Sequence, residues 1–216
     1  GIRKLAELAK EFGEVTVAAP KHQCSGMSHR ITVDAGLEIA RVDFPVEGVE
    51  AYSIDGTPAD CVKVAISNIM KEKPDIVFSG INRGYNIGYD ILYSGTVGAA
   101  MEALMHGVPA IAYSQDDTAD YAVVEKYFGE LTEILLKQKI GETQIWNVNF
   151  PNCTPEEVKG TLYDRTPAKL EFYHERFELE RMDENLYMAN IVHKKKKTAP
   201  EGTDAEALLS HYISVS

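Results

Sequence analysis

The sequence predicts a single α/β domain with a doubly wound, mainly parallel β-sheet. The chain has 216 residues, of which 44% are hydrophobic, so it can bury a substantial core and fits one α/β domain better than two small ones. Helical patterns alternate with short apolar runs, which is the order expected when crossover helices connect parallel strands. We therefore expect residues 1–216 to form one domain with helices on both faces of its sheet.

The first half of the chain supplies the helices and strands that open this alternation. The chain begins with apolar side chains at helical spacing. Gly13 follows them and is a typical helix C-cap. Further on, Thr57 is a capping residue and Pro58 fits the first position of the helix that follows. The expected elements are a helix over 2–12, strands over 14–20 and 50–54, a helix over 57–70 and a strand over 75–79.

The second half continues the alternation and then departs from it. A helix over 96–106, a strand over 109–113, a helix over 121–138 and a strand over 145–150 are expected. From Gly160 the pattern changes, because residues 170–180 and 186–193 alternate like the arms of a β-hairpin around the polar bend at 181–185. We therefore expect a β-hairpin extension within 160–200, followed by a short helix over 203–209 and a closing strand over 212–215.

Composition excludes several classes of partner. The formal net charge of -11 opposes binding to a nucleic-acid polymer, which normally requires a basic surface. No stretch approaches the roughly 20 apolar residues that cross a bilayer, and no signal peptide is recognisable, so we expect no membrane partner. Three dispersed cysteines, Cys24, Cys61 and Cys153, lack the spacing of a zinc or redox motif and favour a reducing cytoplasm.

Three loops of unusual composition are expected near one edge of the sheet. Residues 21–30 and 80–88 each follow a predicted strand, and residues 93–100 run into a predicted helix. They are rich in glycine, serine, asparagine and histidine. Because ligands of open α/β sheets bind beyond the carboxyl ends of the strands, these loops are the first candidates for a binding site.

Ser94, Gly95 and Thr96 stand at a predicted helix start. A helix N-terminus has unpaired N–H groups and about half a positive charge, so this turn is suited to holding phosphate oxygens. Gly95 would let the anion approach closely. Taken alone, however, Ser94 or Thr96 is more often a simple helix cap.

The other two loops also have simpler explanations. Asn82 and Asn86 commonly satisfy backbone groups in a glycine-rich turn, and Ser25 is compatible with an ordinary serine turn. His22 and His29 have no second ligand at metal-binding spacing. Spacing therefore does not decide between a binding site and well-formed turns.

Two charged segments have simple structural explanations. Asp116 and Asp117 follow a predicted strand and are suited to a metal ion, but the simpler expectation is that they begin the next helix beside Thr118. The lysine run at 194–197 is expected to be a solvated, mobile segment without an assigned role.

Longer motifs point to a known family. The chain contains S-G-I-N-R-G at 79–84 and Y-S-G-T-V-G-A-A-M-E at 93–102, together with APKHQCSGMSH, DGTPADCVK and GVPAIAYS. In this order they closely resemble the SurE family of stationary-phase survival proteins, which act as nucleotidases. The resemblance runs from Gly1 to at least Ser114, and the segment EGTDAEALLSHYISVS resembles the end of the family's sequences.

The resemblance implies a Rossmann-like core and a divalent cation, Mg²⁺ or Mn²⁺. It also implies hydrolysis of nucleoside 5′- or 3′-monophosphates and sometimes of short polyphosphate. In the family, the cation is held by two adjacent aspartates after the first strand, by a serine that matches Ser25 and by an asparagine that matches Asn82. The turn matching Ser94, Gly95 and Thr96 lies at the phosphate. Neutral oxygen ligands of this kind suit a hard cation.

The sequence departs from the family at its start. The family begins with a strand that ends in Asn-Asp-Asp-Gly, whereas Gly1 stands where the following helix opens. We expect this strand and the acidic catalytic residues to lie upstream of Gly1 in the natural protein, and activity to depend on them, because a sheet without an interior strand exposes unpaired edges. The hairpin within 160–200 resembles the family's extension for subunit contacts, so a homodimer or homotetramer is expected.

Two other functions compete with a phosphatase. A nucleotide-binding regulatory module would use the same loops without hydrolysis, and turnover with Mn²⁺ or with EDTA distinguishes the two. A dehydrogenase is disfavoured because no G-x-G-x-x-G follows a strand, and residues 80–84 have the wrong spacing.

Overall fold

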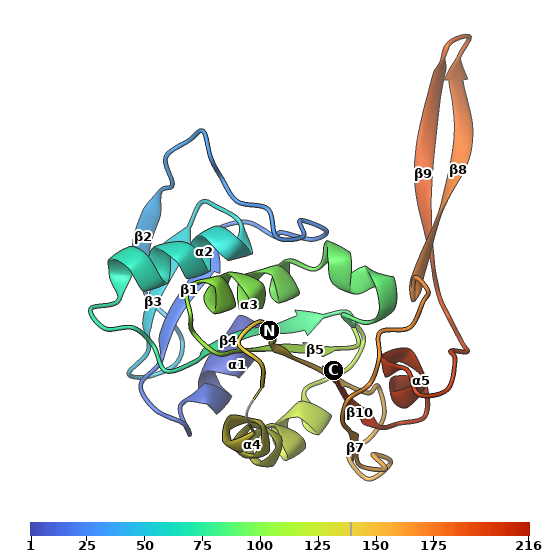
Figure 1. Cartoon of the computed structure of the whole chain (residues 1–216). Coiled ribbons are helices and arrows are strands. Elements are labelled where there is room, and N and C mark those ends of the chain that lie inside the picture. Colours follow the sequence, from blue (N-terminus) through green and yellow to red (C-terminus); the bar gives the residue numbers. More distant parts are fainter. Residues whose placement is uncertain (139) are drawn as a thin grey trace.

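The computed structural model of the chain, which describes residues 1–138 and 140–216, is an α/β fold with a projecting hairpin (Figure 1). Its helical segments are α1 (Ile2–Ala9), α2 (Pro58–Val64), the π-helix η1 (Ala65–Ile69), the 3₁₀ segment η2 (Gly88–Tyr93), α3 (Gly95–Met105), α4 (Ala122–Lys137) and α5 (Asp204–Leu209). Its strands are β1 (Thr16–Pro20), β2 (Ile39–Val42), β3 (Glu50–Ile54), β4 (Val77–Arg83), β5 (Ala110–Gln115), β6 (Trp146–Phe150), β7 (Thr161–Leu162), β8 (Tyr173–Asp183), β9 (Leu186–Lys195) and β10 (Ile213–Val215).

The strands confirm a mainly parallel arrangement, but those described are hydrogen-bonded in two central sheets. One has the order β1-β3-β2, with β1 and β3 parallel and β2 antiparallel. The other has the order β4-β5-β6-β10-β7, in which β4, β5 and β6 are parallel and β10 is antiparallel to β6. Helices α2 and α3 cover one face and α1 and α4 the other (Figure 1), as a doubly wound fold requires.

Helix α1 links the two sheets. Leu5 packs in the apolar cluster of β4, β5 and α4, which includes Ile81. The next residue, Ala6, packs instead with Val17 of β1 and Ala51 of β3. One short helix therefore contributes to both cores.

The larger core is aromatic. Tyr113 of β5 and Phe128 of α4 are fully buried, and their ring centroids are 4.8 Å apart. Phe150 of β6 also stacks against Tyr113, with ring centroids 6.2 Å apart. The Tyr113 hydroxyl shares a 2.7 Å hydrogen bond with Thr132, so its one polar group is satisfied inside the core.

Several element boundaries differ from the predictions for local reasons. The Thr57 side chain accepts from the backbone N–H of Asp60, whose carboxylate accepts from the N–H of Thr57, so the predicted cap is a full capping box. The helix expected over 57–70 is α-helical only to Val64 and continues as η1. Strands β2 and β7 were not predicted, because β2 is a mostly exposed edge strand and β7 has two residues.

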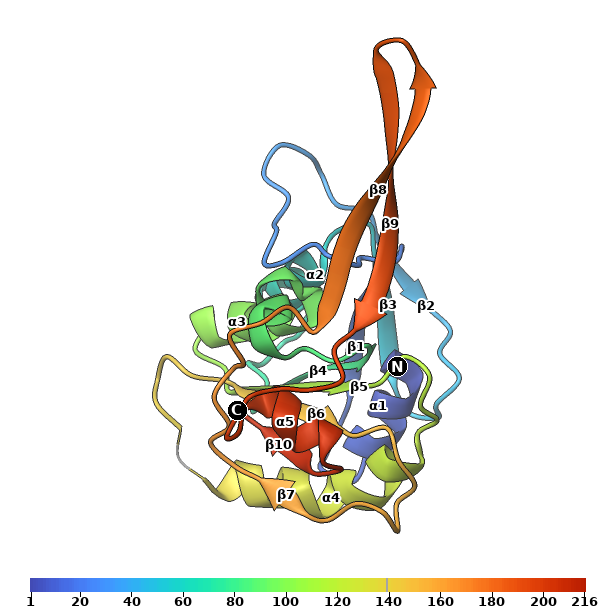
Figure 2. The same ribbon diagram turned by 90° about the vertical axis from the view of Figure 1, so that its right-hand side faces the viewer.

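The hairpin of β8 and β9 projects from the body of the molecule (Figure 2). Its arms are close to the predicted ones, and antiparallel pairing runs from Tyr173 with Lys195 to Asp183 with Leu186. Its base is attached to the body, because the Tyr173 hydroxyl accepts from the backbone N–H of Tyr85 at 2.6 Å. Among the described residues, none of the helices has both the length and the apolar character needed to span a membrane.

Candidate functional site

The loop after β1 lies against the beginning of α3. The backbone N–H of Ser28 donates to the carbonyl of Tyr93 at 3.0 Å, immediately before the predicted phosphate turn. A Cβ added to Gly98 would lie 2.5 Å from the Ser28 carbonyl oxygen, and one added to Gly95 would lie 3.4 Å from that of Cys24. The two glycines of this helix start therefore allow the loop that carries Ser25 to approach closely.

Ser94, Gly95 and Thr96 form the expected helix start. The Ser94 hydroxyl oxygen accepts from the N–H of Val97 at 3.1 Å, so Ser94 is the N-cap of α3. Its hydroxyl hydrogen remains a donor. The N–H groups of Gly95 and Thr96, the first two of the helix, have no intrahelical acceptor by geometry. The cap and an anion-binding turn are thus compatible roles for the same residues.

Asn82 lies near the carboxyl end of β4, beyond a bulge in the pairing with β5. Its side-chain amide donates to the carbonyl of Gly84 at 2.8 Å, which fixes the orientation of the side chain and leaves its carbonyl oxygen as an acceptor. Upstream, a Cβ on Gly80 would lie 2.3 Å from the carbonyl oxygen of Tyr113, so the first glycine of this motif is required for strand packing.

Asn86 has a structural role, which agrees in part with the expectation that it satisfies backbone groups in a turn. Its backbone N–H donates to Asn149 at 2.8 Å, its side chain donates to Ser114 at 2.6 Å, and its carbonyl accepts from Asn147 and Asn149. These side chains are buried. The alternation of asparagines in an otherwise apolar β6 was the available sequence signal for this network.

Ser25 is exposed and accepts a hydrogen bond from the Gln23 side chain at 3.0 Å. The loop that carries it is fixed further along by His29, whose Nε2 lies 2.7 Å from the carboxylate of Glu102 on α3. Glu102 is 4% exposed and also contacts His106 at 3.2 Å. Glu102 was not predictable from the sequence, because its partner His29 is 73 residues away.

The structure thus joins two of the three predicted loops directly. Ser25 belongs to the loop seated on the Ser94 to Thr96 turn. Asn82 lies in β4 and is bonded to Gly84, and among the described residues no hydrogen bond joins it to Ser25 or to the start of α3.

Asp116 and Asp117 do not begin a helix, contrary to the simpler prediction, because α4 begins only at Ala122. Asp116 accepts from the backbone and hydroxyl of Thr118, at 3.0 and 2.5 Å. Burial alone would raise the pKa of Asp116, but these bonds and one from Lys195 outweigh it and lower that pKa. Asp116 is therefore hydrogen-bonded within the loop rather than free for a metal ion.

Lys195 corrects the interpretation of the lysine run as solvated and without a role. Its ammonium group lies 2.9 Å from the carboxylate of Asp116 and also contacts that of Asp117. Although burial acts in the opposite direction, hydrogen bonds to the two aspartates raise the pKa of Lys195. This ion pair attaches the end of β9 to the loop after β5.

Ser25 and Asn82 suit a hard divalent cation in the type of donor atom but not in charge. The Ser25 hydroxyl and the Asn82 amide carbonyl supply oxygen, which such cations prefer. Both are neutral, and the nearby carboxylates of Asp116 and Asp117 are paired with Lys195. Charge for such an ion would have to come from other groups.

Comparison with known proteins agrees with this architecture. A family model described as Survival protein SurE matches residues 1–171. A Clostridium botulinum (strain Kyoto / Type A2) protein named 5′-nucleotidase SurE is 37% identical over 220 residues, covering 100% of this chain and 86% of that protein. A Thermoanaerobacter sp. (strain X514) protein of the same name is 39% identical, with 100% and 85% covered.

A solved structure shows the same fold. The crystal structure of the SurE protein from Aquifex aeolicus superposes with a TM-score of 0.84 at 36% sequence identity. The match covers 100% of this chain and 86% of that one. The chain therefore belongs to the SurE survival-protein family.

Proposed function

We propose that this protein is a nucleotidase, which hydrolyses nucleoside 5′-monophosphates to nucleoside and phosphate. The activity is the one named for relatives that cover the whole chain. The observation that carries the proposal is the seating of the Ser25 loop on the start of α3. The loop and the helix start both carry hydroxyl and backbone N–H donors, which are groups that bind phosphate.

The phosphate is proposed to bind at Ser94, Gly95 and Thr96. Their backbone N–H and hydroxyl groups are donors at the positive end of an 11-residue helix, which favours an anion without a lysine or arginine. As the phosphoryl group reacts, negative charge grows on its oxygens, and fixed donors stabilise that charge without reorganising.

A divalent cation, Mg²⁺ or Mn²⁺, is the proposed cofactor, with Ser25 and Asn82 as neutral oxygen ligands. When bound, such a cation neutralises phosphate charge and polarises the phosphoryl group. The hydrogen bond from Asn82 to Gly84 sets the side-chain amide so that its carbonyl oxygen remains available. The His29 contact with Glu102 holds the loop that carries Ser25.

Finer specificity is also proposed. Nucleoside 3′-monophosphates and short polyphosphate present the same terminal phosphate to the α3 turn, so both belong to the proposed substrate range. We place the reaction in the cytoplasm, where the three free thiols of Cys24, Cys61 and Cys153 would stay reduced.

The hairpin supports a proposed homodimer or homotetramer, with residues 1–216 as one domain and 160–200 as its extension. Phe177 pairs across the hairpin with Ile191, and Leu179 lies two residues along on the same face. All three are more than half exposed, at 60%, 52% and 71% respectively. An apolar ribbon of this kind is typical of a contact surface between subunits.

Light scattering tests the assembly. The unaltered protein is expected to have at least twice the mass of one chain, and Phe177→Glu is expected to reduce it. Glu178→Lys on the opposite face serves as the control. A monomeric unaltered protein would contradict this part of the proposal.

Turnover assays test the reaction. Phosphate release from a nucleoside 5′-monophosphate is measured with Mn²⁺, with Mg²⁺ and after EDTA treatment. Asn82→Ala and Ser25→Ala are expected to lower metal-stimulated turnover by about 10²-fold or more, because each removes a proposed ligand. Asn68→Ala and Ser67→Ala, exposed positions on η1, are matched controls that should leave it unchanged.

The same assays distinguish a nucleotide-binding regulatory module. Such a module would bind the nucleotide, seen by calorimetry, without releasing phosphate under any metal condition. Unchanged turnover in Asn82→Ala would show that the site has been assigned to the wrong residues.

A further inference from the structure

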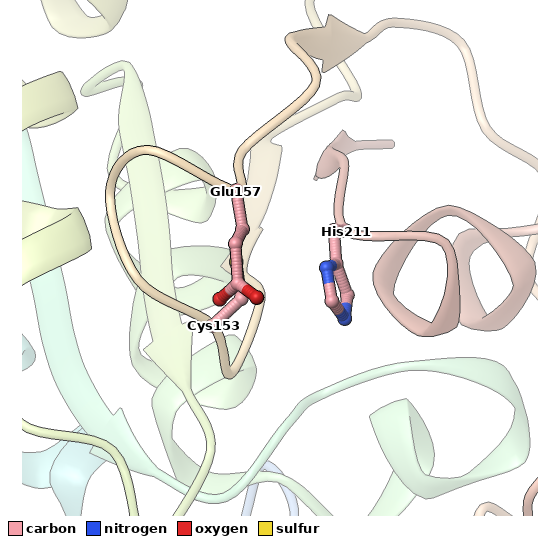
Figure 3. A group of neighbouring side chains, drawn as sticks. All are labelled: Cys153, Glu157 and His211. Atoms are coloured by element: carbon pink, nitrogen blue, oxygen red, sulfur yellow. The ribbon is translucent and has the colours of Figure 1, made fainter.

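A second group of metal-ligand side chains lies away from the proposed phosphate site. Cys153 and Glu157 belong to the loop after β6, and His211 lies between α5 and β10. One ligand atom from each, a sulfur, a carboxylate oxygen and an imidazole nitrogen, lie within 4.8 Å of one another. Figure 3 shows the imidazole of His211 facing the carboxylate of Glu157, with Cys153 beside it.

The loop holds Glu157 in place through Thr154. One carboxylate oxygen of Glu157 accepts from the backbone N–H of Thr154 at 2.8 Å and from its hydroxyl at 3.1 Å. These bonds, first from the backbone and then from the hydroxyl, lower the pKa of Glu157. The other oxygen is left for a further partner, and the carboxylate is charged at neutral pH.

His211 is held by the end of α5. Its N–H donates to the carbonyl of Leu208 at 3.1 Å, and that of Tyr212 donates to Ala207 at 2.8 Å, which is the Schellman pattern. His211 therefore occupies the left-handed position, with φ at 64°, that glycine usually takes. The backbone N–H of Lys159 donates to the His211 carbonyl at 3.0 Å and joins the two segments.

The three side chains face one another without bonding. Among the described residues, no hydrogen bond or ion pair joins Cys153, Glu157 and His211 to each other. Ligand atoms around a tetrahedral Zn²⁺ are about 3.3–3.8 Å apart, given bond lengths of about 2.0–2.3 Å. Side-chain adjustments of roughly 1 Å would therefore bring all three to one ion.

We propose that Cys153, Glu157 and His211 form a binding site for a borderline-soft divalent cation such as Zn²⁺. The mixed sulfur, nitrogen and oxygen set favours Zn²⁺ over Mg²⁺ or Ca²⁺, which prefer oxygen alone. The site is therefore chemically distinct from the proposed ligands Ser25 and Asn82. Binding would connect the loop after β6 to the segment that leads into β10.

Solvent reaches this site, because Glu157 is exposed. A groove of about 410 Å³ is lined by Cys153, Thr154 and Glu157, among others. Three protein ligands leave a fourth position of a tetrahedral ion for water or a small ligand. Burial, followed by the charge of Glu157, raises the pKa of the Cys153 thiol, so the ion displaces the thiol proton to solvent when it binds.

Cobalt and zinc titrations of the reduced, metal-free full chain test the proposal. Co²⁺ bound here is expected to show the thiolate-to-cobalt charge-transfer band, which the oxygen ligands Ser25 and Asn82 are unable to produce. Zn²⁺ affinity, measured against a chromophoric chelator, is expected to fall at least about 100-fold in Cys153→Ser. Cys24→Ser is the matched cysteine control and should keep both the band and the affinity.

His211→Gly separates ligation from folding. Glycine adopts the left-handed position readily, so the metal-free variant is expected to melt at or above the temperature of the unaltered protein. Its Zn²⁺ affinity is expected to fall as much as that of Cys153→Ser. Equal Zn²⁺ affinity in Cys153→Ser and the unaltered protein would overturn the proposal. Co²⁺ binding without a thiolate band, or a band that disappears in Cys24→Ser, would overturn it as well.

Discussion

The contact between Gly98 and the Ser28 loop gives the sharpest test of how the proposed site is assembled. In Gly98→Ala, the new Cβ would lie 2.5 Å from the Ser28 carbonyl oxygen and 2.9 Å from the Cα of His29. Both neighbours are backbone, so relief requires the loop to move by roughly 1 Å. Overpacking of this kind costs about 1–3 kcal/mol.

The higher helix propensity of alanine opposes the cost of this clash and has to be subtracted from the measured change in stability. Alanine is favoured over glycine within a helix by about 1 kcal/mol. Gly129 of α4 provides the control, since its added Cβ would meet only the flexible end of Glu11 at 3.3 Å. Gly129→Ala should therefore show only the stability gained from helix propensity. The difference in stability between the two variants then gives the cost of the clash at Gly98.

The expected difference is large enough to measure. A cost of about 1–3 kcal/mol corresponds to roughly 2–12 °C in Tm for a chain of this size. By calorimetry, Gly98→Ala should melt that much below Gly129→Ala. Because the loop carries Ser25, its displacement should also lower kcat/KM for a nucleoside monophosphate by about 10–100-fold. If both variants are stabilised equally and Gly98→Ala keeps full turnover, the loop is not seated on α3 as described.

Three further perturbations have expected outcomes. Thr57→Ala removes the N-cap of α2 and should cost about 1–2 kcal/mol in chemical denaturation, most of which Thr57→Ser should restore. Phe128→Ala should cost about 3–5 kcal/mol, because it empties the centre of the aromatic core, and a smaller loss would mean that the core collapses around the gap. The lowered pKa of Asp116 contributes stability that is present above its unfolded value of about 3.9 and lost as pH falls through the folded value. Lys195→Met should therefore move acid unfolding to higher pH, whereas Lys194→Met should not.

Features that depend on residues close together in the chain were predictable from the sequence. The capping box at Thr57 needs only Asp60 three residues away, and both are visible in the sequence. The hairpin arms followed from alternation and a polar bend. The rule that loops gather at the carboxyl ends of parallel strands predicted that residues 21–30 and 93–100 would be neighbours.

Features that depend on distant partners were not predictable. Lys195 looked like part of a solvated run because nothing local indicates that the chain brings it to Asp116. The asparagines of β6 form a buried network because the segment after β4 places Asn86 beside them. Likewise, His211 has no sequence neighbour that could bind a metal, and only the packing of β10 against β6 brings it to Cys153.

The division of the core between two sheets has a consequence for motion. The sheet of β1 and β3 rests on small side chains such as Ala6 and Ala51, whereas that of β5 and β6 surrounds large aromatic rings. Less apolar area is buried in the first, so it should open more readily in native-state hydrogen exchange. The loop that bears Ser25 follows β1 of this weaker unit, whereas α3 packs on the other sheet through small side chains such as Val97 and Ala100. Opening of the first sheet would therefore move the Ser25 loop while the second sheet remains folded.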